Sequence, residues 1–424
     1  MSLTQDSFDP LGKSVPKAAS LVDRRRFLRA CGEAAAAGCL LLNTPWAAAD
    51  AQLTVAAPEL LNWGLIGMGQ RMHTHVNIIL RHPERGKIAA ICDIREEALK
   101  DHNATIRERT GKEAPTYVDY KSLLKHPGLN AVCVATPHYL HKQMCIDAME
   151  MGCDVLCEKP LCIHLGDHEE IIQTATRTGR LLTIGYQSRY HVLYPKIMEM
   201  LRDGTIGELK LIQATLFRGD WMQKLPDPET NRMNNWMFRR DMNGDLLIGE
   251  ACHNFEYYNA VIGHPPLKVA GVGGLGVYSD PWRDYNDHSM VVISYEGRVK
   301  VNMNYCLFSS VNHNYFIGDR GWIYIPQPWT GNELKVWRSS DKHRWSGQEQ
   351  VLKVPWDPET QAMGKLGDLE GIPGVHSAFY DSVQTRRKTI TCPEMVRSAE
   401  EIAIGGEMAI AHEKVFDLRT LEIS

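Results

Sequence analysis

The residues most able to do chemistry stand at the end of a short apolar run, where Glu158, Lys159 and Pro160 follow residues 154–157. An isolated Lys-Pro pair is more often a surface lysine before a loop. In doubly wound parallel sheets, however, the carboxyl ends of the strands face the crevice that binds ligands. If residues 154–157 form such a strand, Lys159 points into that crevice, so the segments around it must decide its role.

A second set of reactive residues lies in residues 249–258. Helical spacing predicts that Glu250, His253 and Tyr257 share one helix face. The unperturbed pKa of histidine lies near neutrality, and a carboxylate one turn away can orient the ring and raise its basicity. Taken alone, this segment more often indicates a hydrogen-bonded histidine at a helix edge.

The elements that would position these residues begin with an apolar strand at 60–66. The turn Gly67-Met68-Gly69 follows it and opens a helix with apolar residues at helical spacing. Such a turn lets the backbone approach a pyrophosphate, which the helix amino terminus favours electrostatically. Met72 stands where the usual third glycine would be, so the motif alone is weak.

A second strand, at 88–92, ends in Asp93 and strengthens this interpretation. An acid about 20 residues after the glycine turn is expected to meet the adenosine ribose hydroxyls of a dinucleotide. Asp93 therefore favours NAD, whereas Arg95 leaves NADP open because it can pair with a 2′-phosphate. A further strand at 131–135 precedes Thr136 and Pro137, which suit the start of a helix. His141 is expected in the first turn of that helix, close to the crevice.

The architecture is predicted to change near Gly185. Beyond it the sequence favours an open antiparallel sheet, because hydrophobic alternation recurs in segments separated by turns, at 208–217, 267–276, 289–295, 298–305, 315–317 and 322–325. Segment 223–240, which contains Trp236, is predicted to be a long loop that covers the site. The fold class is thus α/β: an amino-terminal Rossmann domain at 51–185, followed at 186–424 by an α+β domain with an open, mainly antiparallel sheet for substrate binding and oligomerisation.

The first 50 residues are predicted to be an export signal and linker rather than part of the fold. Arg24-Arg25-Arg26-Phe27-Leu28 precedes an apolar stretch, and an alanine-rich segment at 47–49 resembles a cleavage site. The pattern resembles a twin-arginine signal and predicts a periplasmic protein with no stable membrane span after signal removal. Lipoprotein anchoring at Cys39 is the less favoured alternative.

Composition excludes some partners. The chain has 424 residues, 44% of them hydrophobic, and a net charge of −4 with acids and bases intermixed, so nucleic acid is not an expected partner. The eleven cysteines show no paired Cys-x-x-Cys sets, and those in apolar runs are interpreted as buried thiols. No metal site is predicted from them.

These motifs, in this order and spacing, resemble the Gfo/Idh/MocA oxidoreductases, which are named for glucose-fructose oxidoreductase and inositol dehydrogenase. The resemblance extends from about Leu60 to the carboxyl end, and the exported subgroup is the most similar. The departures are Met72 in the phosphate turn and Glu250 where many members have Asp. The resemblance implies a nicotinamide cofactor on the first domain and a sugar or polyol against the second.

The candidate site residues fall into three groups. Those for catalysis are Lys159, His253 and Glu250; those for cofactor binding are Gly67, Gly69, Gln70, Arg71, Asp93, Thr136, Pro137, His141, Glu158 and Lys159; those for substrate binding are Arg189, Tyr186, Trp236 and Tyr257. His253 is expected to remove a hydroxyl proton, Lys159 to stabilise the resulting oxygen, and Glu250 to orient His253.

Three functions stay open. The favoured one is an NAD(P)-dependent oxidoreductase acting on a carbohydrate hydroxyl with a tightly retained cofactor, because little free dinucleotide exists outside the cytoplasm. The first alternative is a redox-neutral NAD-dependent glycosidase that oxidises, eliminates and reduces. The second is an exported carbohydrate-binding protein without turnover. A homodimer or homotetramer is expected, because an open sheet needs its second face covered.

Overall fold

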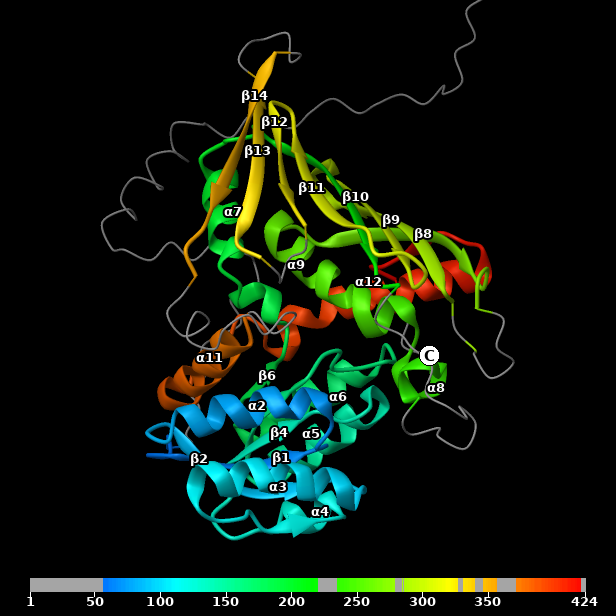
Figure 1. Ribbon diagram of the computed structural model, residues 1–424. Helices are drawn as coiled ribbons and strands as arrows, with labels where there is room; N and C mark the ends of the chain where they lie inside the picture. Colours follow the sequence, from blue (N-terminus) through cyan, green and yellow to red (C-terminus); the bar gives the residue numbers. More distant parts are fainter. Residues whose placement is uncertain are drawn as a thin grey trace, which may run out of the picture. The chain divides into compact units, whose positions relative to one another are not determined.

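The computed structural model describes residues 56–219, 235–278, 284, 286–326, 331–339, 346–356 and 371–420. The predicted export signal at 1–50, with Cys39, lies outside the described residues, as does most of the predicted loop at 223–240. Figure 1 shows the described elements.

The amino-terminal sheet is parallel throughout, with the strand order β3-β2-β1-β4-β5-β6 in the described residues. The order reverses direction between β1 and β4, as in dinucleotide-binding folds. The predicted Rossmann domain is therefore confirmed. Its strands are β1 (Leu61–Ile66), β2 (Gly86–Cys92), β3 (Thr116–Tyr117), β4 (Ala131–Val134), β5 (Asp154–Cys157) and β6 (Leu182–Ile184).

Helices pack against both faces of this sheet, because its strands are apolar on both sides. They are α2 (Gln70–Arg81), α3 (Glu96–Thr110), α4 (Tyr120–Leu123), α5 (His141–Glu150) and α6 (Asp167–Thr178). The sequence did not indicate that α11 (Ile372–Thr385), far along the chain, returns to this sheet. Its Val375 and Phe379 join the core cluster that contains Leu61 and Trp63 of β1.

The second sheet has the order β14-β13-β12-β11-β7-β10-β9-β8-β15 among the described residues. Only β7 and β10 pair in parallel there, so the predicted open, mainly antiparallel sheet is confirmed. Its strands are β7 (Leu209–Phe217), β8 (Pro266–Gly274), β9 (His288–Tyr295), β10 (Lys300–Cys306), β11 (Asn312–Gly318), β12 (Gly321–Ile325), β13 (Glu333–Ser339), β14 (Gly347–Lys353) and β15 (Phe416–Asp417).

One face of the second sheet packs on helices α9 (Cys252–Ile262) and α12 (Pro393–His412). Helix α12 also contacts α6 of the first sheet, so one apolar cluster runs from Val134 and Cys157 to Ile293 and Met303. The short connecting helices are α7 (Leu193–Arg202), α8 (Arg240–Asn243) and the 3-10 turns at His138–Leu140, Gln187–Tyr190, Trp236–Phe238 and Glu296–Arg298. Within the described residues, none of the helices has the length and apolar character needed to cross a bilayer.

Gly67 sits where the chain leaves β1, and its backbone has a φ of +87°. A Cβ built on it would lie 2.6 Å from Ala135 O, at the end of β4. We therefore expect Gly67→Ala to lower the free energy of unfolding by at least about 2 kcal/mol, because a side chain brings both backbone strain and a clash. Chemical denaturation monitored by circular dichroism measures the change.

Gly69→Ala is the matched control, because the nearest atom to its added Cβ is a flexible Arg95 nitrogen at 3.9 Å and its φ is negative. Equal stability of the two variants would contradict the role assigned to Gly67.

Candidate active site

Lys159 links the two sheets at the carboxyl end of β5. Its Nζ donates hydrogen bonds to Gly249 O at 2.8 Å and to Glu250 Oε1 at 3.1 Å. The side chains of the Lys159–Glu250 ion pair are 7% and 13% exposed, respectively, so the ion pair is largely shielded from water. The lysine singled out from the sequence therefore meets the second candidate segment directly, although the two are separated by about 90 residues.

The segment opposite Lys159 is a π-helical turn, Leu247–Ala251, that runs into α9. Cys252 N–H bonds to Leu247 O, five residues back, so this turn holds one residue more than an α-helical turn. The predicted regular helix face for Glu250, His253 and Tyr257 is therefore not what the structure shows. Glu250 instead pairs with Lys159, which sequence spacing alone had not indicated.

His253 lies in the first turn of α9 and is 4% exposed. Its ring meets the Tyr186 ring edge-on, with centroids 5.8 Å apart. Burial, followed by the positive charge of Lys159, lowers the pKa of His253 well below its ordinary value, although Glu158 opposes this. The imidazole is therefore neutral at physiological pH and can accept a proton.

Glu158 is a buried carboxylate between the first domain's α2 and the site. Glu158 Oε1 lies 3.0 Å from His75 Nε2 and 3.5 Å from Arg71 Nε. Burial raises its pKa, but the charges of Arg71 and His75 outweigh burial and hold the pKa of Glu158 well below the ordinary range. The acid is thus ionised and locks the phosphate turn to the end of β5.

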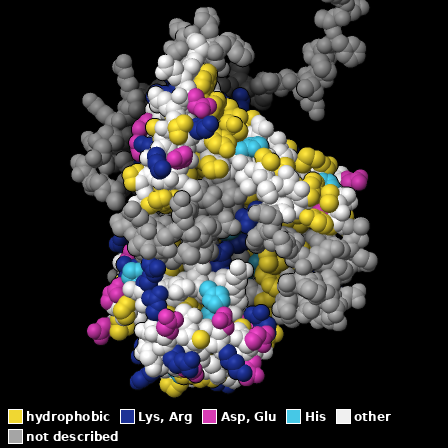
Figure 2. Space-filling view, in the orientation of Figure 1, with side chains coloured by type: hydrophobic (Ala, Val, Ile, Leu, Met, Phe, Trp, Pro, Cys, Tyr) yellow, Lys and Arg dark blue, Asp and Glu magenta, His cyan; other side chains and the backbone are white. Residues whose placement is uncertain are grey.

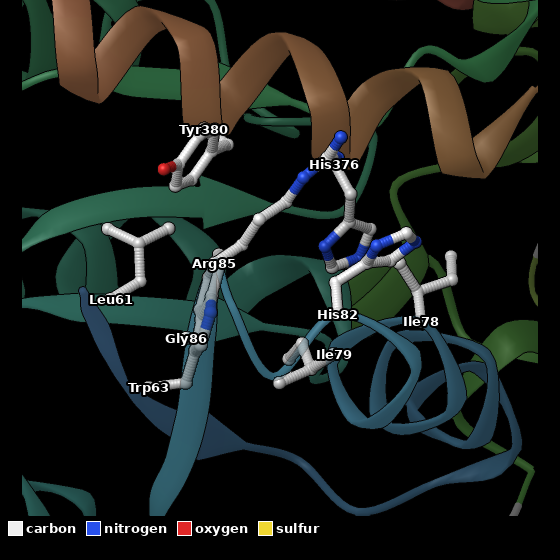
Figure 3. Close-up of a pocket in the computed structure, with 9 residues that line it drawn as sticks. All are labelled: Leu61, Trp63, Ile78, Ile79, His82, Arg85, Gly86, His376 and Tyr380. Atoms are coloured by element: carbon white, nitrogen blue, oxygen red, sulfur yellow. The ribbon is translucent and has the colours of Figure 1, made fainter.

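His75 was missed in the sequence, although it follows the glycine turn on the buried face of α2. Its Nδ1 lies 2.8 Å from His376 Nε2 of α11, so α11 is connected to Glu158 through two histidines. Figure 3 shows His376 projecting from α11 into a cavity of about 20 Å³ beside α2. That cavity begins at Leu61 and Gly86, the first residues of β1 and β2, whereas dinucleotides bind at the opposite, carboxyl ends of such strands.

The predicted cofactor residues gather at those carboxyl ends. The positive φ of Gly67 keeps the turn tight against Ala135 and Thr136. No side chain caps the start of α2 in the described residues, and Gln70 and Arg71 stand at its first turn. These backbone amides and Arg71 fit a pyrophosphate.

Asp93, which the sequence predicts to meet a ribose, directly follows the last residue of β2. Its Oδ2 accepts from Met68 N at 2.7 Å, and Arg95 folds back onto the same carboxylate with Nε 3.1 Å from Oδ1. Asp93, which favours NAD, and Arg95, which suits a 2′-phosphate, are therefore in direct contact. The chain's own groups fit a nicotinamide dinucleotide without distinguishing NAD from NADP.

His141 lies deeper than predicted. It is fully buried, and its ring nitrogens contact two carbonyl oxygens, Nδ1 with Pro160 O at 2.7 Å and Nε2 with Thr136 O at 2.9 Å. The expectation that it lies near the crevice surface is wrong. Because it contacts the residues on either side of the site, it holds the Thr136-Pro137 turn against the Glu-Lys-Pro turn.

Of the four predicted substrate-binding residues, two lie near the site and two lie within the core. Tyr186 stands against His253, but Arg189 is committed to a buried pair with Glu256 at 2.5 Å. Tyr257 is fully buried against Tyr194. Trp236 is half-buried, and the centroid of its ring lies 4.7 Å from that of His138, beside the end of β4. Tyr186 and Trp236 thus lie near predicted site groups, whereas Arg189 and Tyr257 are held within the core.

Glu400 of α12 was also missed, and it organises the turn that carries Lys159. Its Oε1 accepts from Leu161 N at 2.7 Å and from Tyr186 OH at 2.8 Å. Its Oε2 accepts from Cys162 N at 3.0 Å and from His168 Nε2 at 2.8 Å. A glutamate among the buried apolar residues of the segment that forms α12 was the signal that could have found it.

Two family profiles match the chain, and together they cover more than half of it. The first, "Oxidoreductase family, NAD-binding Rossmann fold", matches residues 61–186. The second, "GFO/IDH/MocA C-terminal domain", matches residues 194–324. The first sheet and its helices therefore form an NAD(P)-binding domain.

Curated relatives include a 2,7-anhydro-N-acetylneuraminate hydratase from Mediterraneibacter gnavus, 26% identical over 66% of this chain and 70% of the relative. A glycosyl hydrolase family 109 protein from Shewanella sp. (strain ANA-3) is 28% identical over 53% of this chain and 52% of its own length. A solved levoglucosan dehydrogenase in complex with NADH and levoglucosan superposes with a TM-score of 0.70 at 18% identity, covering 84% of this chain and 99% of that one. At that identity the structural likeness concerns the fold.

Replacing Glu400 tests whether it organises this site. Glu400→Gln places an NH₂ group against two of the four donors, so we expect the free energy of unfolding to fall by roughly 3 kcal/mol and the geometry around Lys159 to loosen. Chemical denaturation measures the stability, and hydrogen exchange of the Leu161 and Cys162 amides, followed by mass spectrometry, measures the local change.

Glu401→Gln is the control, because Glu401 is half-buried and pairs with Arg397 on the outer side of α12. If Glu400→Gln is as stable as Glu401→Gln, Glu400 does not hold the turn.

Proposed function

Because the chain belongs to the GFO/IDH/MocA oxidoreductase family, we propose that it oxidises a hydroxyl group of a sugar, polyol or glycoside with a tightly retained NAD(P). The observation that carries this proposal is Lys159 reaching from the end of β5 to Gly249 and Glu250, one turn before the neutral His253. A buried cation beside a neutral base is a combination typical of catalytic sites.

In this mechanism His253 accepts the proton of the substrate hydroxyl, because its unprotonated ring is maintained by burial and by Lys159. An ammonium carries three N–H donors, and two of those of Lys159 meet Gly249 O and Glu250. The third stabilises the negative charge that develops on the substrate oxygen. A nicotinamide cofactor held by the glycine turn, Arg71 and Asp93 would supply the acceptor for the hydride from the same carbon.

Glu250 acts on Lys159 in this proposal rather than on His253. As the carboxylate paired with a buried ammonium, it offsets the cost of placing that charge in the site and fixes where Nζ points. Glu158 acts similarly toward Arg71, so each cation of the site has its own acid.

The second candidate is a redox-neutral glycosidase, favoured by the likeness to glycosyl hydrolase family 109 proteins. The same proton and hydride transfer would then make a neighbouring C–H acidic. That proton and the glycosidic leaving group would be eliminated, water would add to the resulting double bond, and the hydride would return. The twin-arginine-like segment at 24–28 supports export to the periplasm, where a cofactor recycled in place suits this alternative and the first one. A carbohydrate-binding protein without turnover is the third candidate.

We further propose a homo-oligomer formed through the outer face of the second sheet. Val272 and Met290 are paired across β8 and β9, and with Val292 they are 49% to 61% exposed. Figure 2 shows hydrophobic side chains gathered over the region where Figure 1 places β8 and β9. An exposed apolar patch of this kind is typical of a protein interface.

Purified full-length protein incubated with free sugars and aryl glycosides tests the function. We expect the near-ultraviolet absorption of reduced nicotinamide to rise with at least one sugar, without release of the aryl group. Release without net reduction would support the glycosidase, and saturable sugar binding with neither signal would support the binding protein.

Lys159→Met tests, in the same assay, whether Lys159 takes part in turnover. We expect turnover to fall about 100-fold or more while NAD binding persists. Lys142→Met is its control, because Lys142 of α5 pairs with Asp167 and Glu170 of α6. Full activity of Lys159→Met would remove Lys159 from the mechanism.

The double variant Met290→Glu, Val292→Glu tests the outer face. We expect it to sediment as a smaller species than the parent protein, because two buried carboxylates oppose association. Val118→Glu is the control, since Val118 is 68% exposed on the first domain. An unchanged sedimentation coefficient in the double variant would contradict this interface.

A further inference from the structure

Three potential metal ligands meet between α2 and α3, away from the Lys159–Glu250 pair. His73 of α2 stacks its ring on His102 of α3, with centroids 3.9 Å apart and planes 19° from parallel. His73 Nε2 also lies 3.3 Å from Asp101 Oδ2. One nitrogen or oxygen atom from each of the three residues falls within 4.8 Å of the others.

His102 provides a second, independent observation. It is 1% exposed, and its Nδ1 lies 3.1 Å from Ala98 O. A carbonyl only accepts hydrogen bonds, so Nδ1 carries the hydrogen and the neutral ring presents a lone pair at Nε2. In the described part of the chain, this buried Nε2 meets no hydrogen-bond partner.

This arrangement is typical of a histidine that binds a metal. Metal-binding histidines usually donate their second ring N–H to a carbonyl or carboxylate, which fixes the tautomer and the ring orientation. Ala98 O does this for His102. A proton on Nε2 would instead place a charge on an almost wholly buried ring, which burial disfavours.

We propose that His73, Asp101 and His102 bind a zinc ion that joins α2 to α3. Two imidazole nitrogens and one carboxylate oxygen, with water in the fourth position, form a donor set that suits Zn²⁺. The metal must lie in the plane of each imidazole, so the His73 ring turns away from its stack on His102 when the ion binds. Its side chain is 42% exposed and has room to do so.

The proposed zinc site lies on two helices of the cofactor domain, next to the predicted cofactor-binding turns. His73 lies in the first turn of α2, which begins at the phosphate turn, and α3 begins directly after Asp93 and Arg95. A zinc ion there ties the first turn of α2 to the second turn of α3, the two helices that follow the predicted cofactor-binding turns. It is independent of the proposed hydroxyl oxidation, because none of its ligands takes part in that chemistry.

Zinc binding to the full-length, tag-free protein tests the proposal. After treatment with a chelator and dialysis, calorimetric titration with ZnCl₂ is expected to show one equivalent of binding and a rise in Tm, since a ligand that binds the folded state stabilises it. His102→Gln and Asp101→Asn should each weaken binding by more than about tenfold. Co²⁺ in place of Zn²⁺ should give the intense visible absorption of a four-coordinate ion.

His264→Gln is the matched control, because it removes an exposed histidine elsewhere on the chain and should leave zinc affinity unchanged. Asp101 is 66% exposed, so Asp101→Asn keeps the test valid if His102→Gln fails to fold. The proposal is overturned if the parent protein shows no equimolar binding, or if Asp101→Asn binds zinc as tightly as His264→Gln does.

Discussion

The arrangement of the site depends on one buried carboxylate, Glu400. A carboxyl group removed from water is costly unless its oxygens are hydrogen-bonded, and Glu400 meets this condition with four donors. Two of them are backbone amides of the turn after Lys159, and a third is Tyr186, whose ring lies against His253. The acid thus makes α12 of the second half a support for the turn that carries Lys159 in the first.

Electrostatic pairing repeats around this support and sets the charge state of the site. Lys159 is matched by Glu250, and Arg71 by Glu158, so neither cation stands alone in a region that excludes water. Burial is the largest cause that keeps His253 neutral, and the positive charges of Lys159 and Arg71 lower its pKa further. The same histidine beside an unpaired carboxylate would hold a proton and could not act as a base. The pairing of Glu250 with Lys159 rather than with His253 is therefore functionally meaningful.

The sequence was sufficient to predict the fold class, because glycine turns, apolar runs and strand alternation are local signals. The turn at Gly67, the strand ending in Asp93 and the hairpin of β9 and β10 all follow from such signals. It did not indicate α11 on the first sheet, the His75–His376 contact or the role of Glu400, since these depend on residues more than 200 positions apart. Nor did α-helical spacing locate Glu250, because a single extra residue in the π-turn changes the direction of its side chain.

That extra residue bears on which group Glu250 reaches. An α-helical turn would point residue 250 along the face of His253, and its longer side chain would then meet the ring rather than the lysine. In the π-turn, Gly249 O and Glu250 Oε1 both accept from Lys159 Nζ, so this one turn supplies both acceptors of the ammonium. Position of the backbone, and not residue type alone, thus determines which group the acid serves.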